Sequence, residues 1–391
     1  MPAGSSFADN TIAYEAWLGA LMQLDHDELR DKHRKMRKDP FDFFRATFYR
    51  WAQLWGEHAA DMRLHDAPEV LGVGDLHVEN FGTWRDFDGR LVWGVNDFDE
   101  ACVLPYVNDL VRLSVSAAIA LETGKDEGAF RETVTAEDAA AAILLGYTEG
   151  MNDAVAQPDA RRPYVLAEQR QWLRRIAAER LEKKDEDGKT AFDKIVDNLS
   201  REGLVPLGSP IPEAAAELLL GSFPVPCPYR IGRRQDAGLG SRGRPRYTAV
   251  VDDWNGGLIA REVKALAPSA WLWAQGWQKP AAILYAEALN RAVRSPDPWV
   301  RIRDGWVVRR LAADTGKIRL RDLLPDLDTK LLRAMGRETA NVHSQNVVPL
   351  QDVAKDLAAR HAADTEWFYR ATDHMKAVTL ADWEACKEAK L

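Results

Sequence analysis

The stretch GDLHVENFG at residues 74–82 decides the expected fold, together with VNDFDE at residues 95–100. Apolar segments at 69–73 and 91–95 flank glycine- and aspartate-rich turns, a pattern typical of strand, loop and strand. Because a hairpin brings its two ends together, Asp75, Asn80 and Asp97 are expected to converge.

These three side chains are oxygen donors. Asn80 and Asp97 offer two hard ligands and Asp75 adds a nearby carboxylate, a set that suits Mg²⁺ with its retained waters and substrate phosphates. Aspartate and asparagine also build ordinary turns, which is the plainer interpretation. Their grouping on two short loops favours a metal site.

A second motif, GLGSRG at residues 238–243, matches G-x-G-x-x-G, although such a match alone is weak. A dinucleotide-binding fold requires a helix after the glycines. Here Pro245 and a predicted strand hairpin follow instead. That context favours a loop whose backbone N–H groups close over nucleotide phosphates from a β-hairpin.

Lys264 ends the second strand of that hairpin, about 20 residues past the glycines, where a lysine reaches the α- and β-phosphates of a nucleotide. Glu287 lies in the helix predicted next and is the expected partner of Lys264. The plainer alternatives are a solvated strand-end lysine and an ordinary exposed helix glutamate.

Periodicity divides the rest of the chain into helical and β-rich parts. Helices are predicted over 12–60 and again from 106 to about 200. Within the first of these parts, residues 30–38 are strongly basic. The plain interpretation of this stretch is a solvated helix face, and the alternative is a phosphate-contacting patch.

A proline- and glycine-rich stretch at 203–225 marks a boundary before the β-rich residues 228–312. Two hairpins are predicted there, with turns at Asn255-Gly256 and Asp304-Gly305. A helix is expected between the hairpins at about 281–293, and helices follow again after residue 320.

Composition excludes several classes of protein. The 391 residues carry 60 acidic and 52 basic side chains, a net charge of −8, so no general attraction for nucleic acid is expected. Cys102, Cys227 and Cys386 are too few and too scattered for a disulfide framework or a zinc cluster. Without a signal peptide or a membrane-spanning run, we expect a cytoplasmic protein with neither membrane nor nucleic-acid partners.

The first motif resembles the catalytic and metal loops of aminoglycoside and choline phosphotransferases, and more distantly those of protein kinases. Those small-molecule kinases carry G-D-x-H-x-x-N and then I-D-[FWL], and Asp109 fills the slot of a further aspartate that starts a helix. The wording GDLHVENFG…NDFDEA…NDLVRLSVS is also similar to a bacterial family of unknown function. The motif match covers residues 71–116, and a looser likeness extends over most of the chain.

The order of the motifs departs from the kinase pattern, because the catalytic and metal loops precede the glycine loop. The resemblance therefore implies an α+β, protein-kinase-like two-lobe fold that is circularly permuted. A helical large lobe is expected over residues 1–204, a β-rich nucleotide lobe over 205–318, and helices returning to the large lobe over 319–391.

The resemblance also implies roles and ligands, namely ATP, Mg²⁺ and an unknown small-molecule or protein acceptor with a hydroxyl group. Asp75 would orient the acceptor hydroxyl, with His77 supporting the loop or, alternatively, acting as an acid–base. Asp109 would anchor the catalytic loop. The expected metal ligands are Asn80, Asp97 and Asp99, and the expected nucleotide-binding residues are Gly238, Gly240, Ser241, Gly243, Lys264 and Glu287.

Three alternatives remain open from the sequence. One is a nucleotide-binding pseudokinase without transfer activity, and another is transfer of AMP on the same scaffold. The third is a metal-dependent hydrolase that uses Asp75, His77, Asp97 and Asp99, which leaves the glycine loop and Lys264 without a role.

Overall fold

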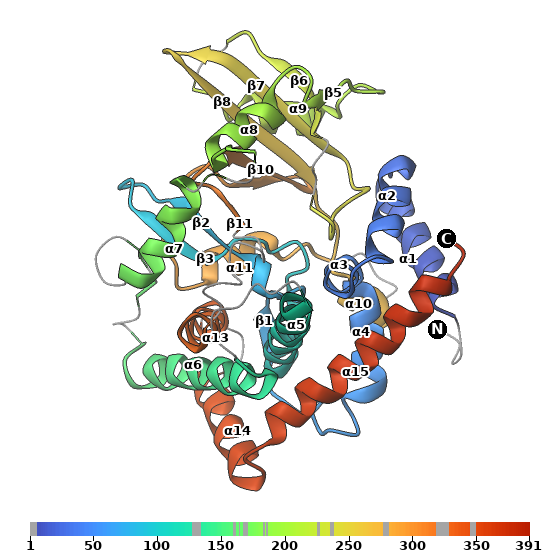
Figure 1. Ribbon diagram of the computed structural model, residues 1–391, viewed down its shortest axis with the longest axis vertical. Coiled ribbons are helices and arrows are strands. Elements are labelled where there is room, and N and C mark those ends of the chain that lie inside the picture. Colours follow the sequence, from blue (N-terminus) through green and yellow to red (C-terminus); the bar gives the residue numbers. More distant parts are fainter. Residues whose placement is uncertain are drawn as a thin grey trace.

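The computed structural model describes residues 6–126, 134–158, 162–163, 165–166, 171–182, 184, 187–224, 227–234, 238–276, 281–317, 328–344 and 349–391. It is a mixed α and β structure, as expected from the sequence. A sheet-rich part lies above a mainly helical part in Figure 1, with α1 to α4 along one side.

The helices are α1 (Phe7–Leu21), α2 (His26–Met36), α3 (Pro40–Ala46), α4 (Phe48–His58), η1 (Val78–Asn80), α5 (Tyr106–Asp126), α6 (Ala136–Ala156), α7 (Gln171–Glu182), α8 (Ala191–Leu199), α9 (Glu213–Leu220), α10 (Ala270–Ala274), α11 (Tyr285–Arg291), α13 (Thr329–His343), α14 (Leu350–Ala363) and α15 (Trp367–Glu388). The strands are β1 (Glu69–Gly72), β2 (Phe81–Arg85), β3 (Leu91–Val95), β4 (Cys102–Pro105), β5 (Leu204–Val205), β6 (Arg230–Arg234), β7 (Arg246–Trp254), β8 (Gly257–Ala265), β9 (Arg301–Arg303), β10 (Trp306–Leu311) and β11 (Gly316–Lys317).

The largest sheet is antiparallel, with strand order β5-β6-β7-β8-β10-β9. Both predicted hairpins are present. Asn255 and Gly256 have φ of 52° and 86°, and Asp304 and Gly305 have φ of 51° and 76°, the backbone signature of tight hairpin turns. The helix expected at 281–293 is shorter, because Ala292 is extended and Val293 donates to Asn341 O of α13 at 3.0 Å.

The two faces of this sheet differ in character because neighbouring strand residues point to opposite sides. On one face, Tyr247, Ala249, Val263 and Val308 form a small apolar cluster with buried residues of α9. The other face carries charged side chains of β7, β8 and β10 and closes over the cavity described below. This charged face is what positions the site.

The main apolar core contains buried residues of the helices α3, α4, α5, α6, α13 and α15 and of the short strands β1, β3 and β4. Its tightest crossing lies between α6 and α13, where Gly146 meets the carbonyl of Arg333 and Gly336 meets the carbonyl of Ile143. A Cβ at either glycine would collide with that carbonyl, so the two backbones are in direct contact.

The first and last helices lie together, because Phe7 of α1 and Cys386 of α15 share one buried cluster. Figure 1 shows both chain ends on the same side of the molecule. Within the described residues, no helix has the length and apolarity that crossing a membrane requires. The expected lobe boundary at 318/319 lies outside the described residues, and the one at 204/205 coincides with the short first strand of the large sheet.

Replacing Gly146 by alanine is expected to lower the free energy of unfolding by about 1–3 kcal/mol, because the added methyl forces α6 away from α13. Gly56 offers a matched control, since it is an exposed position near the end of the otherwise buried helix α4, with open space around it. Gly56→Ala is expected to raise stability by about 0.5–1 kcal/mol through helix propensity. Urea denaturation measures both values, and equal stability of Gly146→Ala and wild type would contradict the close crossing.

Candidate active site

A buried carboxylate fixes the loop that leads to Asp75. Asp109 of α5 is fully buried and accepts hydrogen bonds from the backbone N–H groups of Val73 at 2.6 Å and Gly74 at 2.9 Å. Its Oδ2 also lies 3.0 Å from Nε2 of His343, whose other ring nitrogen is 2.9 Å from the Tyr147 hydroxyl. Asp109 therefore lies where it can anchor the loop that leads to Asp75, as expected.

The glycines of this loop are required by close approach. A Cβ at Gly72 would lie 2.7 Å from Oδ2 of Asp109. Gly74 has φ of +79°, and a side chain there would collide with the carbonyl of Glu100. The loop therefore passes between Asp109 and the segment that carries Glu100.

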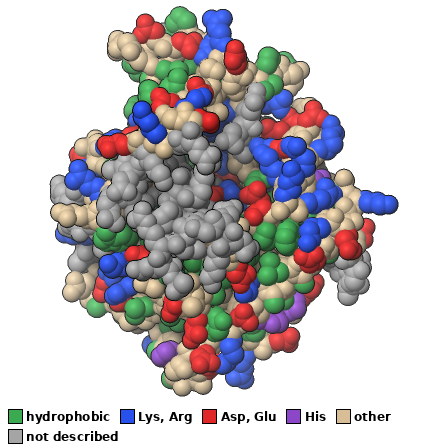
Figure 2. Space-filling model, viewed as in Figure 1, with side chains coloured by type: hydrophobic (Ala, Val, Ile, Leu, Met, Phe, Trp, Pro, Cys, Tyr) green, Lys and Arg blue, Asp and Glu red, His purple; other side chains and the backbone are tan. Residues whose placement is uncertain are grey.

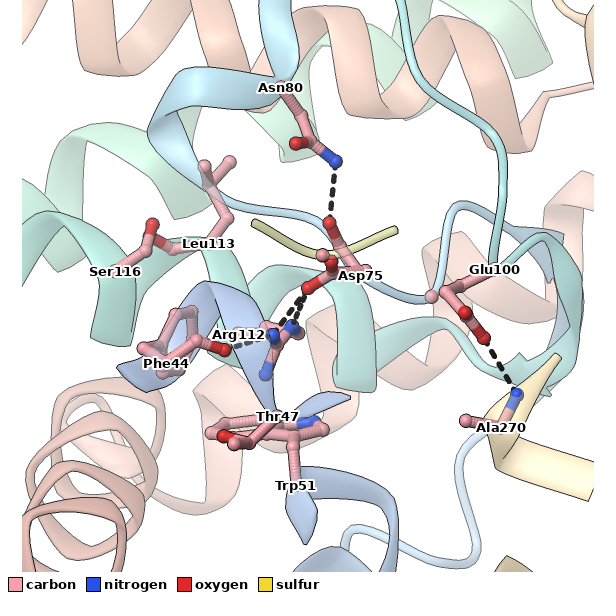
Figure 3. Close-up of polar contacts among 12 residues, drawn as sticks. Phe44, Thr47, Trp51, Asp75, Asn80, Glu100, Arg112, Leu113, Ser116 and Ala270 are labelled. Atoms are coloured by element: carbon pink, nitrogen blue, oxygen red, sulfur yellow. Dashed lines mark hydrogen bonds and ion pairs between the residues drawn. The ribbon is translucent and has the colours of Figure 1, made fainter. Parts of the chain in front are cut away.

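The β2–β3 hairpin brings the two motifs together. Phe81 pairs with Val95, and the N–H of Asn96 donates to the carbonyl of Asn80 at 2.9 Å. The Asn80 side-chain amide donates to the backbone carbonyl of Asp75, as Figure 3 shows. The convergence of Asp75, Asn80 and Asp97 predicted from the hairpin is confirmed in this structure, since all three line one cavity.

This cavity lies between the helical part and the charged face of the large sheet. The wall opposite the large sheet is formed by Asp75, His77, Asn80, Asp97, Asp99 and Glu100. The wall on the sheet side is formed by Gly238, Gly240, Ser241, Arg244, Arg246, Lys264 and Arg309. Residues from α1 to α4 close a further wall: Tyr14, Lys32, Arg45, Ala46, Phe48 and Tyr49.

The glycine motif forms the turn between β6 and β7. Gly238, Gly240 and Ser241 face the cavity. Gly243 does not, because its backbone, with φ of +91°, is turned toward Leu29 of α2. Its N–H donates to the Glu28 carboxylate at 3.1 Å, so this predicted nucleotide ligand instead docks the turn on α2.

The Asp75 carboxylate is held in a fixed orientation by Arg112 of α5. Arg112 Nε lies 3.1 Å from Oδ1 of Asp75, and its Nη2 contacts the same oxygen and donates to the Phe44 carbonyl at 2.9 Å (Figure 3). The guanidinium is fully buried and lies 4.0 Å from the Phe44 ring centroid and 5.1 Å from that of Trp51. Two donors of a buried, stacked guanidinium on one carboxylate oxygen restrict the rotation of the Asp75 side chain.

Lys264 is paired with the metal motif rather than with Glu287. Its Nζ lies 2.5 Å from Oδ2 of Asp99 and 3.8 Å from Oδ1 of Asp97. Burial lowers the pKa of Lys264, and the two aspartates oppose that shift. Glu287 is exposed on α11, which buries Tyr285 and Ala288 instead, so the expected Lys264–Glu287 pair is wrong in this structure.

His77 lies at the floor of the cavity and is 2% exposed. Its ring stands edge-on to Phe41 of α3, with centroids 6.2 Å apart. The next residue is tied to α5, since the Val78 N–H donates to the Ser116 hydroxyl at 3.0 Å, and that hydroxyl donates to the Leu113 carbonyl at 2.7 Å. Burial inside this bonded loop favours the supporting role for His77.

The donor set of Asn80, Asp97 and Asp99 fits Mg²⁺. It offers two carboxylates and one amide oxygen, and Oδ1 of Asp99 is buried with no hydrogen-bond partner. Over the part of the chain that the structure describes, no cluster of three His, Cys, Asp or Glu residues could hold a metal unaided. An ion here would therefore need waters and substrate phosphates to complete its coordination.

Comparison with known proteins finds one family model that matches part of the chain. Residues 24–206 match the model of a family described as an uncharacterized protein conserved in bacteria (DUF2252). The resemblance to a bacterial family of unknown function is thereby confirmed over the segment that holds Asp75, Asn80 and Asp97. The glycine turn and Lys264 lie beyond the matched segment. No curated protein and no solved structure matches the chain significantly.

Sequence reasoning missed most of the cations around the cavity. Buried Glu262 binds Arg246 at 3.1 Å and Arg309 at 2.9 Å, and Arg244 binds Glu100 at 2.7 Å. A signal was available for the first group, because Glu262 and Lys264 lie two positions apart along β8, with Val263 between them, and so share a face. Arg112 was also visible as a lone cation in the mostly apolar run 110–121 of α5.

Asp109→Asn is expected to lower the free energy of unfolding by about 2–3 kcal/mol. In the variant, the side-chain NH₂ group would point at a backbone N–H group or at the His343 ring, where an acceptor is needed. A buried donor would then lack an acceptor. Asp373→Asn, at an exposed place on α15, should change stability by less than about 0.5 kcal/mol. Similar denaturant midpoints for the two variants would contradict the anchoring role.

Glu338 of α13 supports the end of β3, which leads into the loop that carries Asp97. Its carboxylate lies against Gly94 and accepts a hydrogen bond from the Asn341 amide at 3.0 Å. Burial raises the pKa of Glu338 to about 7. Because the folded state binds the proton of Glu338 more tightly, protonated Glu338 stabilises the fold fully below the ordinary carboxyl pKa of 4.5. This stabilisation is lost as the pH rises through about 7.

We therefore compare the free energy of unfolding of Glu338→Gln with that of wild type. The value for the variant minus the value for wild type should increase between about pH 5 and pH 8, by on the order of 3 kcal/mol in all. Denaturation across that pH range measures the difference. Glu384→Gln, at an exposed position on α15, controls for the loss of one carboxyl group. A pH-independent difference for Glu338→Gln would contradict the raised pKa of this buried carboxyl group.

Proposed function

We propose that this protein is an ATP- and Mg²⁺-dependent phosphotransferase with a circularly permuted, kinase-like two-lobe fold. The observation that carries the proposal is the shared cavity. Asp75, Asn80, Asp97 and Asp99 face the glycine turn and Lys264 across it, although Lys264 and Asp99 are 165 positions apart in the sequence. Two independent sequence motifs with complementary chemistry therefore meet in one place.

The path of the chain supports the permuted fold. The glycine turn leads into β7, the β7–β8 hairpin ends at Lys264, and β10 lies beside β8 in the same sheet. These parts occur in kinase order within the sheet, while the catalytic and metal loops come first in the chain. Because Phe7 and Cys386 pack in one cluster, joining the ends and opening the chain elsewhere would leave the packing intact.

Asp75 would accept a hydrogen bond from the acceptor hydroxyl and orient it toward the transferred group. The clamp by Arg112 suits this positioning role, since phosphoryl transfer depends mainly on alignment and charge stabilisation. Asn80, Asp97 and Asp99 would hold Mg²⁺, which would supply positive charge to neutralise the phosphates.

The sheet side of the cavity would bind the phosphates. Lys264, whose ammonium group pairs with Asp99 and lies near Asp97, would bind the α- and β-phosphates. The turn residues Gly238, Gly240 and Ser241 offer backbone N–H groups on the same side. Arg246 and Arg309 keep this wall positive, although both also contact Glu262.

Thermal-shift titration with ATP and Mg²⁺ tests the proposal. Saturating ligand at about 100 times Kd should stabilise the wild type by about 2.7 kcal/mol, and the shift should require Mg²⁺. Asp97→Asn should lose most of it, whereas Asp88→Asn, exposed on the β2–β3 turn, should keep it. A folded wild-type sample that no nucleotide stabilises would contradict the proposal, and stabilisation by metal alone would favour the hydrolase.

The products separate transfer of a phosphoryl group from transfer of AMP. Across a panel of hydroxyl acceptors, ADP as the nucleotide product is the expected result, with turnover lost in Asp75→Asn. Release of pyrophosphate would assign AMP transfer, and binding of ATP without turnover on any acceptor would favour a pseudokinase.

A further inference from the structure

Lys32 differs from the exposed arginines of the basic stretch on α2. Arg30 and Arg34 have side chains 72% and 66% exposed and pair with Asp27 and Asp31 on the same helix. Basic side chains gather on the side of the molecule where Figure 1 places α2, as Figure 2 shows. Lys32 instead is 6% exposed and lines the cavity. The solvated-face interpretation therefore holds for Arg30 and Arg34, but not for Lys32 or for His33, which is also buried and lies 2.6 Å from Glu15.

Lys32 is also the exception among the cations of the cavity. Arg45 pairs with Glu79 at 2.8 Å, Arg244 with Glu100, Arg246 and Arg309 with Glu262, and Lys264 with Asp99. No carboxylate of the described residues forms an ion pair with Lys32. Its ammonium donates one long hydrogen bond, of 3.3 Å, to the carbonyl of Gly240.

That hydrogen bond places the Lys32 ammonium beside the proposed reaction centre. Gly240 faces Asp75 closely, since a Cβ on Gly240 would lie 3.5 Å from Oδ2 of Asp75 and 3.4 Å from the carbonyl of Arg45. Lys32 therefore lies where the glycine turn approaches Asp75.

The position of Lys32 is enforced by the docking of α2 on the glycine turn. The Asp25 N–H donates to the Gly243 carbonyl at 2.9 Å, and the Glu28 carboxylate accepts from the Gly243 N–H. Asp31 forms an ion pair with Arg242 of the same turn. These contacts hold the helix and the turn together as one unit, so Lys32 moves with the turn.

A buried ammonium with a single weak acceptor is costly unless a ligand supplies the missing partners. Burial lowers the pKa of Lys32 to about 8, and the charge of Glu15 opposes that shift. An oxyanion in the cavity would supply both the negative charge and the acceptors for the remaining N–H groups.

We propose that Lys32 binds a phosphoryl oxygen in the space between the glycine turn and Asp75. The proposal deepens the proposed function and rests on it for the identity of the nucleotide. The oxyanion has two possible sources with the same chemistry, the terminal phosphate of ATP and a phosphate carried by the acceptor or free in solution. In either case Lys32 would act directly at the transferred group, while Lys264 acts on the inner phosphates.

Calorimetric titration of the full chain tests the proposal with three probes: ATP with Mg²⁺, ADP with Mg²⁺, and inorganic phosphate. The variants are Lys32→Met, Lys32→Arg, which keeps the charge, and Lys38→Met, an exposed lysine just beyond the same helix. We expect Lys32→Met to bind ATP at least about tenfold more weakly while binding ADP as wild type does. Lys32→Arg should recover part of the loss, and Lys38→Met should match wild type.

The other outcomes are equally decisive. Loss of phosphate binding alone in Lys32→Met would support Lys32 and assign the oxyanion to the acceptor or to free phosphate. Wild-type binding of phosphate through Lys32, without binding of either nucleotide, would support Lys32 and overturn the proposed function. Equal weakening of ATP and ADP with phosphate unaffected, or unchanged binding of all three probes, would overturn the role of Lys32. Failure of the wild type to bind any probe would overturn both proposals.

Discussion

The site depends on one buried carboxylate, that of Asp109. It holds the backbone of Val73 and Gly74 from one side, while His343 and Tyr147 extend the network into α13 and α6. The loop that presents Asp75 is thus bonded to the most tightly packed helices of the core. A loop fixed in this way can keep a second charged contact, Asp75 with Arg112, in a single geometry.

Charge balance is the second constraint on the cavity. Each cation on the sheet side is matched by a carboxylate, and Glu262, which meets Arg234, Arg246 and Arg309, is the clearest case. The arginines hold the pKa of Glu262 well below its usual range despite its burial. Against this matched background, Lys32 and the partnerless Oδ1 of Asp99 stand out as groups that a ligand would complete.

Local rules predicted the elements whose structure is decided locally. Asn255-Gly256 and Asp304-Gly305 made both hairpin turns predictable, and the β2–β3 hairpin made the convergence of Asp75, Asn80 and Asp97 predictable. The meeting of the glycine turn with Asp75 followed only from the resemblance to kinases, because no local pattern links segments so distant in sequence. The predicted Lys264–Glu287 pair was wrong for the same reason. The orientation of α11 is set by the packing of Tyr285 and Ala288 into the core, which no local pattern predicts. Lys32 was one of several basic residues on a helix, and only the docking of α2 distinguishes it.

The most direct test of the central claim is a crystal structure of the full chain with Mg²⁺ and a non-hydrolysable ATP analogue. We predict the triphosphate between residues 238–241 and Lys264, with the metal on Asn80 and Asp97 and the terminal phosphate directed toward Asp75. A nucleotide bound elsewhere, or a metal held by Asp75, His77, Asp97 and Asp99 with no phosphate in its coordination, would contradict the permuted kinase-like site.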